Sequence, residues 1–531
     1  MEDVNIEFEL TGLDIGILIA YVIGILAIGI WIGRNKQDQE SFFLGGRGSN
    51  WFVVGFALMA ANLSGTSYVG LAGAGYEDGI SVWNYEWMAT LILCFFAVFV
   101  LPFYLHSKVS TMPEFLEKRY DARSRVLFSA FTIFTAMFID ASAAMYAGGI
   151  TLQLLFPDVP LFWLIAAIAL MGGVYVLLGG LSAVMITDTI QGLLLLTAGG
   201  IIFLIGFSAL GSWQAIVDAA PEGGFSVFKP ADDDFLPWPG NITGVLWLGL
   251  YYWITNHVVV QKVLSARNVN HGRWGALLCG FLQLPLLFLL ILPGTMGREL
   301  YPDLPDPDMV WPAMAFDMLP VGLRGLILAA LVAALMSTLD SALNGTSSLV
   351  TNDFVRKIKP DYSEQRLLYY GRITIAVLMV LAISWSPQIA NFPTIVEYLQ
   401  AFLGHVTMPV VVVFLGGLFW RRATQVAAFY TLVIGVPVGI IMFGLGEVLE
   451  LYDLQFLYAT GLLVLFSAVM FVGISLLTPS PDQQAIAEIT WSTTTWQEET
   501  ADLEGVPWWL NYRYMALSLV VLTVVLVIYF A

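Results

Sequence analysis

The sequence predicts an all-α polytopic membrane protein with about fourteen transmembrane helices. Of its 531 residues, 58% are hydrophobic and only 12% are charged. Soluble globular proteins are less hydrophobic and contain about twice this share of charged residues. Apolar runs near twenty residues recur along the chain, which is the length that a helix needs to cross a bilayer. They are too long and too evenly apolar for barrel strands. The predicted spans are roughly 13–33, 51–74, 80–104, 125–155, 161–178, 184–207, 241–262, 273–297, 321–350, 371–388, 394–419, 423–446, 455–477 and 512–530.

The basic residues lie in alternate connections between these spans. With the N-terminus outside, the inner connections hold all of the 22 Lys and Arg residues except Lys229, Arg298 and Arg324. This asymmetry is the positive-inside pattern. It predicts a multi-pass protein of the cell (inner) membrane with both termini outside the cytoplasm. The acidic N-terminus MEDVNIEFELTG lacks the basic region of a cleaved signal peptide, so we expect the first span to be retained.

Several function classes lack their sequence signals. No P-loop is present for ATP binding, and Cys94 and Cys279 lie in apolar spans, where packing is the expected role. The polar segment 478–511 reads as an acidic cytoplasmic loop, with or without a surface helix, between a membrane core over 1–477 and a final span over 512–531. The net charge of −18 fits either a salt-rich habitat or ordinary solubility.

Four carboxylates interrupt the predicted spans: Glu86, Asp140, Asp188 and Asp340. A charge at the middle of a membrane helix costs about 3 kcal/mol to insert, so such acids normally face an interior cavity and indicate an ion or substrate path. The spans contain no central Lys or Arg to pair with them. Unpaired acids of this kind favour binding of a cation.

The stretch ALMSTLDSALNG, residues 334–345, places oxygen-bearing side chains on one helix face. At about 100° per residue, this face holds Ser337, Asp340, Ser341, Asn344 and Ser348, with Thr338 at its margin. A hard cation such as Na⁺ prefers oxygen ligands. The alternatives are hydroxyls bonded back to their own helix or used between helices, and we accept these for Ser347 and Ser348.

Two spans show interruptions in corresponding halves of the chain. The second span reads ALMAANLSGTSYVGLAGAG, whose central polar and small residues predict a broken helix beside a cavity, tight packing being the alternative. The second interruption is in LWLGLYYWITNH, where Gly249 precedes an aromatic cluster. Paired discontinuous helices are typical of transporters built from inverted repeats.

The segment YVLLGGLSAVMITDTIQ at 175–191 is similar to the signature of the sodium:solute symporters. The motifs LSGTSYVGLAGAGY, NYEWMA, LYYW, ALMSTLDSALN and FLGGLFWRR follow the order of that family, and the resemblance covers about 12–477. The chain most resembles the sodium/galactose and sodium/glucose branch. This resemblance implies a leucine-transporter-like 5+5 inverted repeat, about 51–207 and 241–419, with flanking helices.

The resemblance also implies ion sites. The principal sodium site would use the backbone carbonyls of Ala60, Leu63 and Ala334 with the hydroxyls of Ser337 and Thr338. A second sodium site, present in some members, would use Asp188, Asp340 and Ser341. Many members of that family carry Ser or Ala at the matching position, so Asp340 here implies either stronger sodium binding or a proton carried by one of the two acids.

For the organic substrate, the sugar branch implies Asn62, Glu86, Tyr252, Trp253 and Gln400. Ser67, Gln283 and Gly249 depart from the bacterial galactose pattern, which leaves the identity of the sugar open. Carboxylate and amide oxygens suit sugar hydroxyls, and an aromatic face suits the apolar side of the ring. The absence of an internal cation favours a neutral polyhydroxylated solute over an organic anion.

We therefore expect a symporter, not an enzyme, that imports a sugar such as glucose or galactose, or a polyol such as inositol, together with Na⁺. The alternative is a sodium- or proton-coupled symporter of an amino acid or of a carboxylate such as sialic acid. A channel would not accumulate solute, and an enzyme would need a catalytic cluster that the sequence does not show. The expected partners are the small-molecule solute, sodium and membrane lipid, with no nucleic acid.

Overall fold

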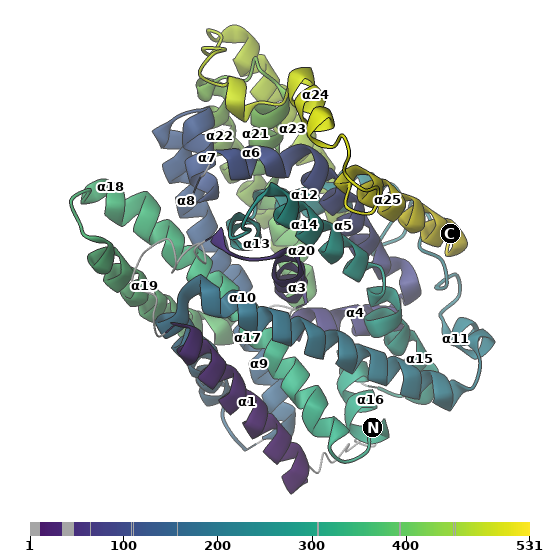
Figure 1. The fold of residues 1–531 in the computed structure, drawn as a ribbon. Coiled ribbons are helices and arrows are strands. Elements are labelled where there is room, and N and C mark those ends of the chain that lie inside the picture. Colours follow the sequence, from purple (N-terminus) through teal and green to yellow (C-terminus); the bar gives the residue numbers. More distant parts are fainter. Residues whose placement is uncertain are drawn as a thin grey trace.

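The computed structural model describes residues 11–33, 47–63, 65–107, 109, 111–156, 158–304, 307–391, 395–449, 451 and 453–531. Within these ranges the regular structure is helical, and β pairing is confined to two isolated bridges, Ser49 with Ala266 and Lys229 with Pro237. The all-α prediction is therefore confirmed. Figure 1 shows long helices packed around the short helix α3, which lies near the middle of the bundle.

The first half of the chain forms helices up to residue 219. Their bounds are α1 Gly12–Gly33, α3 Trp51–Asn62, α4 Gly65–Glu77, α5 Asn84–Phe95, α6 Leu101–His106, α7 Met112–Arg119, α8 Ala122–Thr135, α9 Ser142–Leu155, α10 Leu161–Leu210 and α11 Trp213–Ala219. A 3₁₀ turn at Gly79–Trp83 precedes α5, and π-helical segments join α5 to α6 (Phe96–Val100) and α8 to α9 (Ala136–Ala141).

The second half repeats this arrangement of long, locally interrupted helices. Their bounds are α12 Leu246–Leu250, α13 His257–Leu264, α14 Val269–Gln283, α15 Leu292–Leu300, α16 Val310–Met318, α17 Leu323–Leu349, α18 Arg356–Ile358, α19 Glu364–Trp385, α20 Ile395–Val406, α21 Met408–Phe419, α22 Gln425–Phe443, α23 Phe456–Leu477, α24 Thr493–Asp502 and α25 Tyr512–Tyr529. Additional π-helical segments are Asn241–Val245, Tyr251–Thr255, Leu287–Ile291, Val350–Val355 and Gly444–Val448, and further 3₁₀ turns are Pro307–Met309, Ser386–Asn391 and Ala487–Ile489.

Many of these helices have the length and hydropathy of membrane spans. Among the described residues, eight stretches qualify by length and composition: Gly79–His106, Ala122–Gly149, Ala183–Leu210, Val269–Leu300, Glu364–Trp385, Gln425–Gly446, Phe456–Leu477 and Tyr512–Tyr529. Shorter apolar helices, including Trp51–Asn62 and Met408–Phe419, accompany them. The count of about fourteen crossings stays a prediction.

One pair of predicted crossings differs in the structure. The spans predicted at 161–178 and 184–207 lie in a single continuous helix, α10, of 50 residues. Its 50 residues are more than twice the roughly 20 that one crossing needs, so the two predicted crossings are joined without a non-helical connection. The connecting residues include Gly179 and Gly180 but no proline. Glycine weakens a helix without removing a backbone donor, so helical hydrogen bonding can continue through it.

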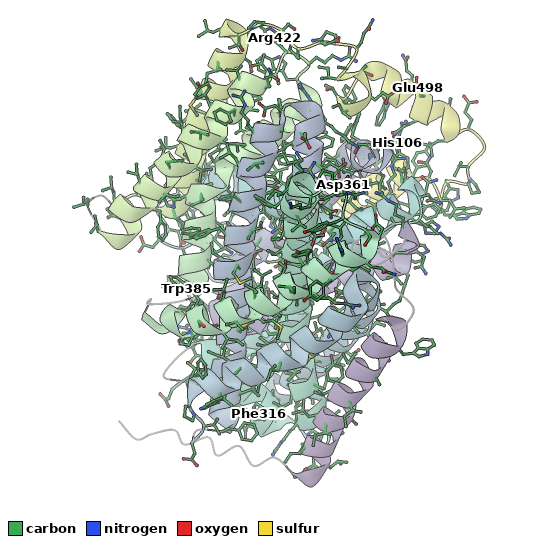
Figure 2. The ribbon with its side chains drawn as sticks, turned by 90° about the vertical axis from the view of Figure 1, so that its left-hand side faces the viewer. His106, Phe316, Asp361, Trp385, Arg422 and Glu498 are labelled. Carbon is green, nitrogen blue, oxygen red and sulfur yellow. The ribbon has the colours of Figure 1, made fainter. Side chains whose placement is uncertain are left out.

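The segments that the charge pattern assigns to the inner side contact one another. These contacts are Arg47 with Val109, Glu117 with Lys357, Arg119 with Gly417, Trp420 and Ala423, and Arg273 with Glu499. Arg422 and Glu498, from two of these segments, lie at the opposite end of the molecule from Phe316 in Figure 2. The predicted grouping of the basic connections at one end is therefore consistent with the fold.

The segments assigned to the outer side also contact one another. Their hydrogen bonds join Asp14 with Gly322, Tyr76 with Arg298, Ile80 with Gly224, Val227 with Phe530, and Phe235 with Gln455. Phe316, in α16, lies at this end of the molecule (Figure 2). Connections assigned to the inner side thus contact one another at one end of the molecule, and those assigned to the outer side contact one another at the other end. This is the arrangement expected when successive helices cross a membrane in opposite directions.

The first helix is fixed to the start of α17 by a carboxylate. Asp14 accepts hydrogen bonds from the backbone N–H groups of Gly322 at 2.7 Å and Gly325 at 2.9 Å. A side chain at Gly325 would collide with α1, because a Cβ there would lie 2.5 Å from the Asp14 carbonyl oxygen. Asp14 therefore caps the helix that bears the predicted sodium ligands, although it comes from another helix.

We expect Asp14→Ala to lower the free energy of unfolding by about 1 to 2 kcal/mol, the usual cost of removing an N-terminal cap. Asp14→Asn keeps an acceptor oxygen and should lose less than half as much. Denaturation of the purified protein in detergent measures both. An equal loss in the two variants would show that the cap oxygen contributes nothing and that the charge alone matters.

The acidic segment 478–511 contains a short surface helix, α24, that packs on the membrane core. Glu499 forms an ion pair with Arg273 of α14 and accepts a hydrogen bond from the Tyr512 hydroxyl at 2.9 Å. The Trp496 ring stacks on Phe99, with the ring centres 5.8 Å apart. The segment is thus anchored by charge and aromatic contacts at the ends of the neighbouring helices.

Candidate functional site

The second predicted span is broken, as the sequence indicated. Helix α3 ends at Asn62, and Leu63 has φ −78° and ψ 85°, outside the helical region. The next helix, α4, begins at Gly65. The Leu63 N–H still bonds to the Met59 carbonyl. The Ala61 and Asn62 carbonyls accept instead from the hydroxyls of Tyr252 and Ser67, as expected where a helix end leaves carbonyls without helical donors.

The corresponding helix in the second half is also broken within the predicted stretch LWLGLYYWITNH, at Asn256. Asn256 has φ −64° and ψ 115°, and its side chain caps α13 by accepting from the Val258 N–H at 2.9 Å. Gly249, in the same stretch, lies inside α12 and does not itself interrupt the helix. A Cβ there would lie 2.4 Å from Ile92 Cδ1. Gly249 therefore permits close packing on α5, and the cap residue, not the glycine, ends the helix.

Four of the predicted substrate residues meet beside the first break, and we call them the polar cluster: Asn62, Ser67, Glu86 and Gln283. The Asn62 Nδ2 donates to Glu86 Oε2 at 3.2 Å and to Gln283 Oε1 at 3.1 Å. The Ser67 hydroxyl donates to the Asn62 carbonyl at 2.9 Å. Glu86 is 7% exposed and Gln283 is fully buried. Helices α3, α4, α5 and α14 thus each contribute one polar side chain to a single point.

The predicted aromatic residues lie next to this cluster. Tyr252 is half-buried and its hydroxyl donates to the Ala61 carbonyl at 2.9 Å. Trp253 is almost fully buried and packs edge-on against the Tyr252 ring, with centres 5.0 Å apart. Tyr252 is therefore the more accessible ring of the two. Gln400 is half-buried on α20, a helix that contacts α4.

The predicted sodium residues lie on two helices in contact. Ala60 and Leu63 are at the end of α3, and α3 packs against α17. Residues 334, 337 and 338 follow one another on one face of the continuous helix α17. Thr338 is half-buried and Ser341 is buried. The side chains of Ala334, Ser337 and Asp340 lie outside the described part of the structure.

Asp188 has a basic partner that the sequence analysis did not foresee. Lys262, in the last turn of α13, forms an ion pair with Asp188 of α10 and donates to the Ala57 carbonyl of α3 at 3.2 Å. Both side chains are buried, at 1% and 0% exposure. The expectation that no internal base pairs with the acids is therefore wrong for Asp188. Lys262 lies at the inner end of a predicted span, and the break at Asn256 turns α13 so that this end reaches the core.

Elsewhere in the described residues, no group of three His, Cys, Asp or Glu side chains could hold a metal ion. The polar groups that converge are instead carbonyls, amides, hydroxyls and single carboxylates. Such donors fit a hard monovalent cation and a hydroxylated solute.

Comparison with known proteins distinguishes between the function classes that the sequence left open, namely symporter, channel and membrane enzyme. Residues 42–435 match the sodium:solute symporter family. The chain belongs to this family. The symporter is 31% identical to the sodium/glucose cotransporter 4 of Danio rerio over 96% of this chain and 85% of that protein. It is 30% identical to the sodium/myo-inositol cotransporter 2 of Bos taurus, over 90% of this chain and 79% of that protein. These relatives are sodium-coupled cotransporters and not enzymes.

The fold of the symporter agrees with this assignment. A solved structure of a Na⁺-coupled sialic acid symporter, in a substrate-bound outward-open state, superimposes with a TM-score of 0.78 at 22% identity. The match covers 90% of this chain and all of that one. The symporter is thus a multi-pass membrane protein with the leucine-transporter-like fold that the resemblance implied.

Asp140, another of the predicted intramembrane acids, lies half-buried in the π-helical segment between α8 and α9.

Proposed function

We propose that this symporter uses the sodium gradient to import a neutral polyhydroxylated solute, either a sugar such as glucose or galactose or a polyol such as inositol. The observation that carries this proposal is the polar cluster beside the Tyr252 ring at the break of α3. The cotransporters to which the chain is similar are named for glucose and myo-inositol, which supports the same class of solute.

The chemistry of the cluster fits hydroxyl groups. Glu86 supplies acceptor oxygens, while Asn62 and Gln283 each supply an acceptor and donors. In the described part of the chain, the side-chain hydrogen bonds of these three residues are to one another and to Cys279, and none is to Lys or Arg. An organic anion would meet the Glu86 carboxylate without a compensating cation. Sialic acid, the solute named for the structural neighbour, therefore fits this cluster less well than a neutral solute.

We assign the principal sodium site to the carbonyls of Ala60, Leu63 and Ala334 with the hydroxyls of Ser337 and Thr338. Sodium bound there would join the broken helix α3 to α17. The Tyr252 hydroxyl bonds to Ala61, which lies between two of these carbonyls. Asn62, the next residue, belongs to the polar cluster. Ordering of the α3 terminus by sodium would therefore also order the substrate residues, which is the coupling that symport requires.

Transport would then follow alternating access. Sodium would favour the outward form and complete the substrate site, and closure would release both solutes to the other side. Each charge that moves through 100 mV contributes about 2.3 kcal/mol before the concentration term. We place the protein in the cell membrane, with the basic connections and segment 478–511 in the cytoplasm and both termini outside, because the basic residues lie at one end.

Uptake into proteoliposomes tests this function. The purified full-length protein is reconstituted, and labelled sugars, polyols, amino acids and sialic acid are offered under an inward sodium gradient and under choline at the same pH. We expect sodium-dependent accumulation of at least one sugar or polyol. Accumulation of an amino acid or of sialic acid alone would contradict the solute class, and accumulation in choline under a proton gradient would contradict the ion.

Two variants at Tyr252 separate the roles of its ring and its hydroxyl. Tyr252→Phe keeps the ring face and loses one hydrogen bond, worth about 1 kcal/mol. We therefore expect the solute and sodium concentrations at half-maximal uptake to rise by up to about fivefold. Tyr252→Ala also removes the ring and should reduce uptake far more. Uptake at varied solute and sodium concentrations measures both effects. Equal losses in the two variants would show that the ring face does not cover the solute.

A further inference from the structure

A buried lysine lies where the sequence suggested a second ion. Lys262 Nζ pairs with Asp188 and donates to the Ala57 carbonyl. Its ammonium group therefore touches α10 and α3 while its backbone belongs to α13. Both charged side chains are excluded from solvent, so the pair is not a surface ion pair of the kind that contributes little.

The position of this ammonium relates it to the proposed sodium site. Ala57 is three residues before Ala60 on α3, so the two carbonyls lie about one turn apart along the same helix. Asp188 is the acid that the family resemblance assigns to a second sodium. The ammonium thus lies between the acid of the second site and the helix that supplies carbonyls to the first.

The ligands of the ammonium are those that a sodium ion would need. A carboxylate oxygen and a backbone carbonyl are hard donors suited to a monovalent cation. An additional cation at the same carboxylate would meet a fixed positive charge. Two unit charges about 4 Å apart, at an effective dielectric constant of about 20, repel strongly enough to weaken binding roughly a thousandfold.

We propose that Lys262 is a tethered cation that fills the second cation position of this symporter, so that one sodium ion, and not two, accompanies each solute. This inference rests on the proposed function. Because the ammonium is covalently attached, it returns to its starting place in each transport cycle and adds no net charge to the transported solute. Asp188 is then a counter-charge within the protein and not a ligand of a transported ion.

The number of bound sodium ions tests the proposal without any solute. Equilibrium binding of radioactive sodium to the purified full-length protein should give one ion per protein. Lys262→Gln keeps a donor for the Ala57 carbonyl but frees Asp188 from its charge partner, and should give two. In proteoliposomes the charge moved per solute, obtained from the reversal potential, should rise from one toward two in the same variant.

Three further variants serve as controls. Lys262→Arg keeps the positive charge and should bind one sodium ion. The double variant Asp188→Asn, Lys262→Gln removes both charges and should return to one. Arg273→Gln breaks another ion pair, with the partly buried Glu499 on α24, outside either proposed ion site, and should also stay at one.

Two bound sodium ions in the wild-type protein would overturn the proposal, and this result needs no variant to fold. A count of one in a folded Lys262→Gln protein, with an unchanged sodium dependence, would also overturn it, because the pair would then only hold helices together. Failure of the wild type to accumulate any sugar or polyol would contradict the proposed function instead, while the sodium count would still decide the role of Lys262.

Discussion

Replacement of Glu86 by alanine should abolish sodium-driven solute uptake. The carboxylate is 7% exposed and lies 3.2 Å from Asn62 Nδ2 at the break of α3. A hydrogen bond to a charged group contributes about 1.5 to 3 kcal/mol. Loss of the carboxylate should therefore lower the affinity for the solute roughly 10- to 150-fold for each solute hydroxyl that Glu86 binds. Removal of the carboxylate also leaves the Asn62 amide with one partner fewer. Initial uptake rates over a range of solute concentrations measure this loss.

Two comparisons make the Glu86 result specific. Glu86→Gln keeps the size and one acceptor oxygen, so it should retain part of the uptake. Glu488→Ala removes an exposed acid of segment 478–511 and should leave uptake unchanged. If Glu86→Ala transports a sugar or polyol at the wild-type rate, then the polar cluster is not the substrate site.

Replacement of Thr338 or Ser337 by alanine should raise the sodium concentration needed for half-maximal uptake by at least about tenfold, or about 1.4 kcal/mol. Each change removes one oxygen from a site that we build from three carbonyls and two hydroxyls. The α17 carbonyls, that of Ala334 included, already accept a helical hydrogen bond in this continuous helix. They offer sodium only a second lone pair and do not replace a lost hydroxyl. Uptake titrated with sodium at saturating solute measures the shift.

Ser347 provides a matched control on the same helix. Its hydroxyl donates to the Gly371 carbonyl of α19 at 2.8 Å, so it joins two helices and is not one of the proposed sodium ligands. Ser347→Ala should keep the wild-type sodium dependence. Unchanged sodium dependence in both Ser337→Ala and Thr338→Ala would refute the principal sodium site.

The local features of the site could be predicted because they depend on neighbouring residues. The polar and small residues after Ala61 indicated a helix break, and α3 ends at Asn62. The second break lies within the predicted stretch, at Asn256. Glycine is the stronger signal in a sequence, yet Gly249 lies inside α12, where a Cβ would collide with Ile92, and the Asn256 side chain caps the next helix, α13.

The residues of the substrate site were predicted from the resemblance to the symporter family and not from the periodicity of the sequence. Asn62 and Glu86 are 24 residues apart, and Asn62 and Gln283 are 221 residues apart. No local pattern relates such positions. The structure brings these three side chains within hydrogen-bonding distance, whereas Gln400 is placed only by the contact of its helix with α4.

The sequence by itself determined the helical membrane class, the grouping of basic connections and the oxygen-bearing face of 334–345, because composition, charge order and helical period are local properties of the chain. Only the tertiary structure decided which charges meet. Lys262 looked like an ordinary basic residue at the end of a span, yet the turn at Asn256 directs it to Asp188, 74 residues earlier in the chain. A buried charge is stable only beside a partner, and the packing of α3, α10 and α13 determines that partner.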